Sequence, residues 1–212
     1  YLPLLLSLTT SSPFFEGEDS GLHSYRTKLF EALPLAGMPD YLANWNHFEK
    51  LTEQLEVAGI ISSVKDLWWD VRPHPGFGTV EIRVCDIPIT FKEIIAIVAL
   101  IQALVVTLIN SEPYPDTHIQ ILQSNKWQAA RYGLDGIHVD PINFKKLSIK
   151  KAIENLFLLV QPTMTSLGTE KYLDKLEEVL KGSTGSTIQR NLYEKSKDFK
   201  KVIKTLMEKF YQ

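Results

Sequence analysis

The stretch that decides the fold is LWWDVRPHPGFGTVEIRVCD, residues 67–86. Two runs rich in β-branched and aromatic residues flank a segment of prolines and glycines, a pattern typical of strands joined by a turn. We therefore predict strands at residues 67–72 and 79–85, connected by residues 73–78. A hairpin of this kind places the side chains of both strands on two common faces.

One face of the second strand is charged and the other is apolar. Successive side chains alternate between the faces of a strand, so Thr79, Glu81 and Arg83 share one face and the intervening Val80, Ile82 and Val84 share the other. A carboxylate and a guanidinium two residues apart can hold a metal ion and a phosphate oxygen side by side, as phosphoryl transfer requires.

The alternative is a solvated face with an ordinary cross-strand ion pair, and the spacing by itself favours that alternative. The number of charged residues on the predicted hairpin favours a functional site instead. The first strand adds Asp70 and Arg72, and the connection adds His74, beside two tryptophans.

Helical patterns surround the hairpin. Before it, residues 24–33 and 45–58 read as helices, the second with Asn44 as its cap and Gly59 as its stop. After it, five helices are predicted at residues 90–110, 116–132, 148–160, 170–181 and 187–211. We expect an α+β fold in one domain, with a strand-bearing catalytic part at residues 1–89 and a helical part at 90–212.

Two strands form only a marginal sheet, so further strands are expected from sequence upstream. The apolar residues 1–8 lack the basic start and cleavage site of a signal peptide, and we interpret them as a core segment. Residues 94–109 are fewer than the roughly 20 needed to cross a bilayer and contain Gln102, which favours a buried helix and no membrane span.

Composition excludes several functions. The net charge is −2 with both signs mixed along the chain, which argues against nucleic-acid or membrane-surface binding and favours small molecules or proteins. The single cysteine, Cys85, cannot form an internal disulfide and fits a small buried position, so we expect a cytoplasmic protein.

Two further arginines are candidates, each with a plainer alternative. Arg26 follows the loop ending at Gly21 and could clamp a carboxylate or phosphate, or be a surface residue of a first helical turn. Arg131 ends a helix at Gly133 and could simply complement the negative C-terminus. Residues 182–186 lack the lysine and preceding strand of a phosphate loop, which favours a linker between helices.

Taken together, these stretches resemble the glutamate-cysteine ligase type 2 family of carboxylate-amine ligases. The resemblance runs in order through almost the whole chain. Its motifs are YLPLLLSL at residues 1–8, SSPFFEG at 11–17, SYR at 24–26, the stretch at 67–86, WQAARYGLD at 127–135 and GSTGSTIQR at 182–190. Phe15 stands where a tryptophan is expected, which puts the amine pocket in doubt.

The resemblance implies a glutamine-synthetase-like catalytic fold, in which an antiparallel sheet accompanied by many helices forms a concave site. It implies ATP-dependent joining of the γ-carboxylate of glutamate to the amine of cysteine, through an acyl phosphate and with Mg²⁺. Glu81 would be a metal ligand and Arg83 would steady the transferring phosphate. Arg72 and Arg26 would hold carboxylate or phosphate groups.

Weaker candidates for lining the same substrate and nucleotide cleft are Tyr25, His74, Asn125 and Arg131. The resemblance also implies a homo-oligomer and an N-terminal half, absent from this sequence, that carries further acidic ligands. The isolated chain is therefore expected to be inactive. The same ATP-dependent chemistry on another acid and amine, or a non-catalytic binding module, are the alternatives.

Overall fold

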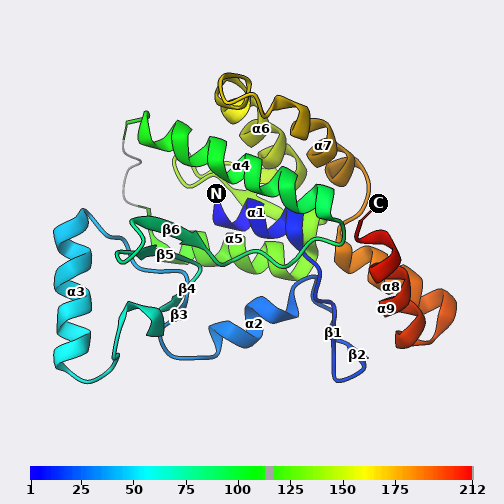
Figure 1. The fold of residues 1–212 in the computed structure, drawn as a ribbon, viewed down its shortest axis with the longest axis horizontal. Coiled ribbons are helices and arrows are strands. Elements are labelled where there is room, and N and C mark those ends of the chain that lie inside the picture. The colour runs from blue at the N-terminus through cyan, green and yellow to red at the C-terminus, as the bar shows by residue number, and fades with distance from the viewer. Residues whose placement is uncertain (113–116, 212) are drawn as a thin grey trace.

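The computed structural model describes residues 1–112 and 117–211. Helices dominate and the strands are short, so the chain mixes α and β structure as the sequence predicts (Figure 1). The helices are α1 (Leu2–Thr9), α2 (Tyr25–Glu31), α3 (Trp45–Val57), α4 (Phe91–Ile109), α5 (Ile119–Tyr132), α6 (Ile149–Ser166), α7 (Leu173–Lys181), α8 (Gly185–Ser196) and α9 (Phe199–Lys209). The strands are β1 (Phe14–Phe15), β2 (Glu18–Asp19), β3 (Ala36–Gly37), β4 (Trp68–Trp69), β5 (Val71–His74), β6 (Thr79–Ile82), β7 (Ile137–Val139) and β8 (Lys146–Ser148). Short 3-10 helices are η1 (Val64–Asp66), η2 (Gly133–Asp135) and η3 (Glu170–Tyr172).

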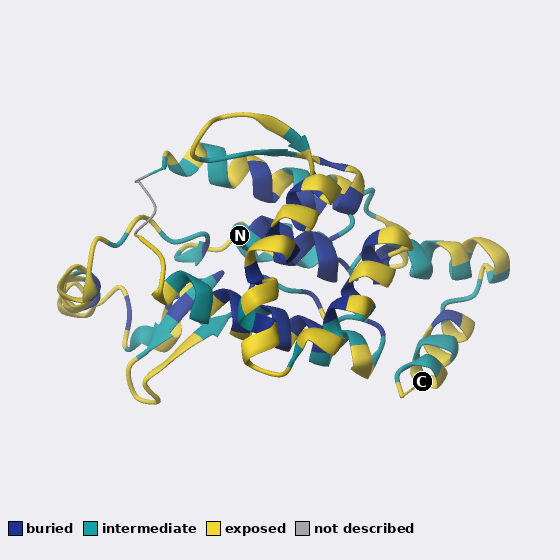
Figure 2. Cartoon of the chain, turned by 90° about the horizontal axis from the view of Figure 1, so that it is seen from above, coloured by how far each residue is buried: buried dark blue, intermediate teal, exposed yellow. Residues whose placement is uncertain are grey.

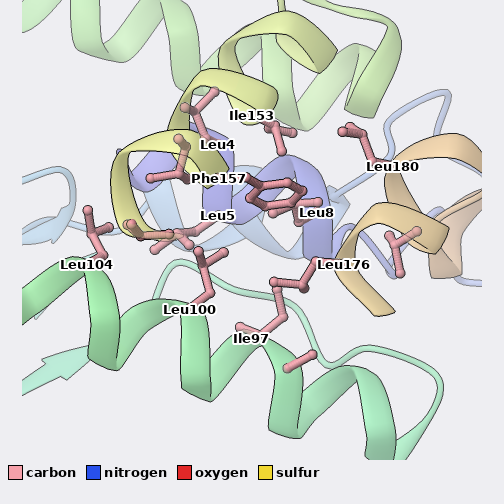
Figure 3. Close-up of a cluster of buried hydrophobic side chains, with 14 of the residues drawn as sticks. Leu4, Leu5, Leu8, Ile97, Leu100, Leu104, Ile153, Phe157, Leu176 and Leu180 are labelled. Carbon is pink, nitrogen blue, oxygen red and sulfur yellow. The ribbon is translucent and has the colours of Figure 1, made fainter. Parts of the chain in front are cut away.

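The main core is built around α1. Helices α5, α6 and α7 pack against it, and α4 packs on α6 and α7. Leu5 of α1, Leu100 of α4 and Phe157 of α6 belong to the same buried cluster (Figure 3). The expectation that residues 1–8 form a core segment is therefore confirmed, because every α1 residue after Leu2 is buried.

Helix α4 is mostly apolar after its first turn, which contains Lys92 and Glu93, but it is buried on one side only. Thr90 caps it, accepting a hydrogen bond from the Glu93 N–H at 3.2 Å. Ala96 and Leu100 are fully buried, whereas Val98 and Ile109 are 56% and 76% exposed. By length and composition α4 is the one described helix that could span a membrane, with a third of its residues buried. The prediction of a buried helix is thus correct for its inner face only.

The predicted hairpin is present, but its first strand breaks at Asp70. Strand β4 pairs in parallel with β3, whereas β5 pairs antiparallel with β6. The Asp70 N–H donates to the Gly37 carbonyl at 2.7 Å, and the Asp70 carbonyl accepts from the N–H groups of Arg83 and Val84. The chain therefore changes partner at Asp70, and β6 ends at Ile82, three residues before the predicted end.

The apolar face predicted for the second strand is correct only at its inner end. Val84 is buried and Ile82 packs against the main core, but Val80 is 57% exposed. Phe77 in the adjoining turn is exposed as well. The prediction is wrong at the tip because the turn end of the hairpin lies outside both described cores.

The strands form four separate two-stranded sheets among the described residues. Three are antiparallel and the β3–β4 pair is parallel. The single larger antiparallel sheet expected from the resemblance is therefore not formed by residues 1–112 and 117–211. The β7–β8 pair was missed by sequence analysis because each of its strands has three residues and little alternation.

The helical part follows the predictions except at α6 and near its end. Helix α6 continues through Pro162 to Ser166, six residues beyond the predicted end at residue 160, and Met164 extends its buried face. Residues 187–211 form two helices, because Lys197 adopts a left-handed conformation (φ +50°) and Asp198 caps α9. Residues 182–184 do link α7 to α8, and Thr184 is buried against Thr10, with their hydroxyls 2.8 Å apart. The predicted start of α5 at Asp116 lies outside the described residues.

A second, smaller core lies under the hairpin. Phe48 of α3 packs with Ile61, Leu67 and Trp69, apart from the main cluster. The Asn44 side chain caps α3 as predicted, accepting from the His47 N–H at 2.9 Å.

Buried residues concentrate in the central helices, and exposed ones at the periphery (Figure 2). The boundary at residue 89 between two parts of one domain stays a prediction.

Candidate functional site

The centre of the candidate site is a three-residue ionic network on the hairpin. The register places Arg72 of β5 directly opposite Glu81 of β6. The Arg72 Nη2 lies 2.6 Å from Glu81 Oε2, and the Arg83 Nη1 lies 3.0 Å from Glu81 Oε1. Each oxygen of one carboxylate is thus held by a different guanidinium.

This network favours the ionised form of Glu81. Burial raises the pKa of the carboxyl, but the hydrogen bonds and positive charges of Arg72 and Arg83 outweigh that effect and hold the pKa below its ordinary value. The side chain of Glu81 remains 40% exposed. It is therefore an ionised, accessible carboxylate.

Arg72 is tied to the backbone beneath the site. It is 4% exposed, and its Nη1 donates to the carbonyls of Val64, Lys65 and Leu67 at 3.1, 2.7 and 2.8 Å. Its buried Nε has no hydrogen-bond partner among the described residues. The geometry makes Arg72 the residue that orients Glu81, and its contact with substrate stays a prediction.

A small hollow opens beside the network. Its walls include Arg26, Arg83 and Asp70, and its cavity volume is about 20 Å³. The guanidinium carbon of Arg26 lies 5.1 Å from the ring centre of Phe30, and that of Arg83 lies 5.5 Å from Trp68. These two rings stack on each other at 5.3 Å. Two positive charges backed by aromatic rings suit an anionic group such as a carboxylate or phosphate.

Asp86 joins this hollow to the N-terminal loop. One carboxylate oxygen accepts from the Ser11 N–H and the Ser12 hydroxyl, both at 2.8 Å, and the other accepts from the Ser24 hydroxyl at 3.1 Å. The Arg26 Nη1 lies 3.6 Å away, and its Nη2 donates to the Arg83 carbonyl at 3.1 Å. Asp86 therefore fixes the position of Arg26 relative to Arg83.

Sequence analysis missed a buried lysine behind the hollow. Lys126 of α5 is 1% exposed, contacts the Asp70 carboxylate, and lies 2.6 Å from a carboxylate oxygen of Glu31. Burial raises the pKa of Asp70, and the Lys126 charge offsets this only in part. A detectable signal exists in the pattern of α5, where Lys126 falls four residues from Leu122 and from Ala130 on the inward face.

The other predicted residues lie at different distances from the network. Tyr25 precedes Arg26 and stacks on Phe15 at 4.6 Å between ring centres. His74 lies at the outer end of β5 and stacks on Phe77 at 4.5 Å. Tyr25 is thus next in sequence to a residue of the hollow, and His74 belongs to the hairpin itself.

Asn125 and Arg131 are placed elsewhere on α5. The Asn125 amide makes two hydrogen bonds with the backbone of Val139, at 2.7 and 2.8 Å. Arg131 lies over Tyr132 and against Gly21, where an added Cβ would be 2.8 Å from the guanidinium. None of the described contacts links these two residues to Glu81. Their roles in binding stay predictions.

The described residues do not form a metal site by themselves. No group of three or more His, Cys, Asp or Glu side chains able to hold a metal occurs within residues 1–112 and 117–211. Mg²⁺ is commonly held by one or two carboxylates together with water and substrate phosphates. The exposed Glu81 carboxylate is of the type that could be one such ligand, although each of its oxygens is paired with a guanidinium here.

Cys85 does not belong to the reactive groups of the site. Burial raises the pKa of its thiol to about 11, so the nucleophilic thiolate is scarce at neutral pH. It packs against the main core just beyond β6. The expectation of a small buried residue is met in part, because Cys85 packs against that core but is only partly buried.

The site thus combines an ionised carboxylate, two guanidiniums paired with it and a small hollow, and guanidiniums can bind a carboxylate or a phosphate. Residues 1–209 match the family described as glutamate-cysteine ligase family 2. The chain therefore belongs to glutamate-cysteine ligase family 2, a family of carboxylate-amine ligases.

Three relatives illustrate the match, each named "Putative glutamate--cysteine ligase 2". The protein from Gloeobacter violaceus is 40% identical over 210 residues, which cover 97% of this chain and 56% of the relative. The protein from Solibacter usitatus is 35% identical, covering 98% and 55%, and that from Thermobifida fusca is 38% identical, covering 99% and 54%. The chain thus spans about half the length of the curated relatives it matches.

Proposed function

We propose that this chain is the C-terminal part of an ATP-dependent ligase that joins the γ-carboxylate of glutamate to the amine of cysteine. The single observation that carries the proposal is the Arg72–Glu81–Arg83 network beside the hollow of Arg26. Family membership and the names of the relatives support it.

The chemistry explains why such a network is needed. A carboxylate is a poor electrophile, so the proposed reaction uses ATP with Mg²⁺ to convert it to an acyl phosphate, which the amine then attacks. Negative charge accumulates on the reacting groups, and fixed positive charges nearby lower the barrier.

Each residue has a proposed task within this chain. Arg83 and Arg26 neutralise the anionic groups that enter the hollow, and their aromatic backing keeps both guanidiniums in place. Glu81 supplies one oxygen ligand for the metal. Arg72 holds the Glu81 carboxylate in a fixed orientation from beneath. Cysteine as the acceptor rests on the names of the relatives alone, since none of these contacts selects an amine.

The proposal includes the rest of the ligase. In a glutamine-synthetase-like fold, β5 and β6 would belong to a larger antiparallel sheet whose other strands and acidic ligands come from the half of the relatives' length that this chain does not span. We also propose a cytoplasmic location, since a free thiol such as Cys85 needs no oxidising compartment. A homo-oligomer completes the proposal, and light scattering of the purified ligase tests it.

The test is product formation by the complete ligase. We would supply ATP, Mg²⁺, glutamate and cysteine, follow ADP release, and identify γ-glutamylcysteine by mass spectrometry. Arg83→Ala should reduce turnover at least about 100-fold, as loss of one preorganised charge typically does. Lys151→Ala, at an exposed pair with Glu154, should leave turnover unchanged.

Other outcomes separate the alternatives. ADP release that requires a different acid or amine would keep the ligase chemistry and replace the substrates. No ADP release with any acid and amine, from a folded and complete protein, would contradict the enzyme and favour a binding module.

A further inference from the structure

Helix α4 presents an exposed apolar surface, which the Phe210 ring meets at one end, 6.4 Å from the ring of Phe91. Its exposed side chains include Phe91, Val98, Val105 and Ile109, which are 49%, 56%, 37% and 76% exposed. Separations of seven, seven and four residues place these four on one side of a helix. We call this set the α4 stripe.

The opposite side of α4 packs into the main core. Ile97, Leu100 and Leu104 point together toward α1 and α6 (Figure 3). No charged residue occurs between Glu93 and Glu112, so the stripe is flanked by uncharged side chains over most of its length. A helix that is apolar all round is normally buried all round, and a contiguous exposed apolar patch marks an interaction site.

A membrane is a poor fit for this surface. Helices α6 and α7 pack on the inner side of α4, so α4 cannot be surrounded by lipid without them. The N-terminal end of α4 is also tied to α7 through Glu93 and Lys175, 3.9 Å apart. The fold therefore favours a protein partner.

The size of the stripe argues against a second copy held by this surface alone. A helix of 19 residues is about 28 Å long, so its exposed side offers on the order of 300 Å². Two such faces would bury on the order of 600 Å² in total, well below the roughly 1,200 Å² of a small stable interface. The occupant must cover more of the molecule than the stripe.

The relatives supply a partner of suitable size. This chain matches 56% of the Gloeobacter violaceus protein, so 44% of that protein lies outside the match. We propose that the α4 stripe is the docking surface for this complementary portion of the ligase, which covers it with apolar side chains. The inference rests on the proposal above that the working ligase contains such a portion.

The test uses thiol labelling in the complete ligase, with this chain joined to or co-expressed with the complementary portion. Val98→Cys places a thiol in the stripe, and Ile203→Cys places one on α9 at matched exposure, 56% against 57%. The partly buried Cys85 contributes little background, because its pKa is raised to about 11. Rates are normalised to those of the same variants in denaturant.

We expect the thiol at position 98 to react at least about tenfold more slowly than the one at 203, and Val105→Cys to behave like Val98→Cys, since covered groups react only when the interface opens. Equal rates at 98 and 203 would overturn the inference. Protection that disappears when the protein is diluted to monomers would assign the stripe to a second copy instead, and protection seen only with lipid vesicles would assign it to a membrane.

The assay needs no substrate and no turnover. A ligase inactive with every acid and amine can still show the protection, and an active ligase can lack it. Failure of this inference is therefore distinguishable from failure of the proposed function.

Discussion

The main helical core and the hairpin region are held together in different ways. In the core, side chains such as Leu5, Leu100 and Ile153 are fully or almost fully buried and make apolar contacts only. In the hairpin region, Arg72, Lys126 and Asp70 are buried too, but each has charged or backbone partners at defined distances. Apolar burial tolerates exchange of similar side chains, whereas a buried charge depends on particular partners.

This difference indicates which region determines stability and which carries the candidate site. The core supplies stability without chemical specificity, and the hairpin region uses part of that stability to keep charges in a fixed arrangement. Variants in the two regions should therefore have different kinds of effect.

The largest loss of stability is expected for Lys126→Met. Removing the ammonium leaves the carboxylates of Asp70 and Glu31 without their shared partner, which typically costs about 3–5 kcal/mol of the free energy of unfolding. Urea denaturation of the complete ligase measures this loss. Lys150→Met, at an exposed pair with Asp135, should change stability by less than about 0.5 kcal/mol. Equal effects would mean that the buried cluster is not special.

Leu100→Ala in the main core should cost about 3 kcal/mol, because Leu100 is fully buried and the truncation leaves a cavity. Turnover measured well below the melting temperature should remain within about twofold of wild type. A loss of turnover matching that of Arg83→Ala would contradict the separation between core and site.

Asn44→Ala removes the capping hydrogen bond of α3 and should cost about 1 kcal/mol. Because α3 packs on the small cluster with Phe48 and α4 packs on the main core, hydrogen exchange should accelerate in α3 more than in α4. Uniform acceleration in both helices would show that the two cores unfold as one unit.

The smallest effect concerns pH. The folded pKa of Glu81 lies below its ordinary value, so its stabilisation is fully present above the unfolded pKa and is lost as pH falls through the folded pKa. With the side chain 40% exposed, screening limits the contribution to less than about 1 kcal/mol. The stability difference between wild type and Glu81→Gln should therefore be constant at neutral pH and shrink below about pH 4. A difference that grows on acidification would contradict the assignment.

Sequence reasoning succeeded where a local pattern determines the structure. Alternation placed Glu81 and Arg83 on one face, and the hairpin brought Arg72 opposite Glu81. The cap at Asn44 followed from a side chain that satisfies a free N–H group. These features depend on residues within a few positions of one another.

It failed where distant segments decide. The break at Asp70 depends on Gly37, and the burial of Lys126 depends on a carboxylate 56 positions away. The helix ends at Lys197, where the sequence has neither glycine nor proline to predict an end. In each case a long-range contact or an unusual backbone conformation overrides local preference.

The central claim is that the Glu81 carboxylate acts in catalysis and not merely in a surface ion pair. The most direct measurement compares turnover and melting temperature for Glu81→Gln with those for Glu154→Gln, whose carboxylate pairs with Lys151 at 2.9 Å and is 51% exposed. The account predicts at least about a 100-fold loss of turnover for Glu81→Gln alone, with both melting temperatures close to wild type. Equal turnover in the two variants would contradict it.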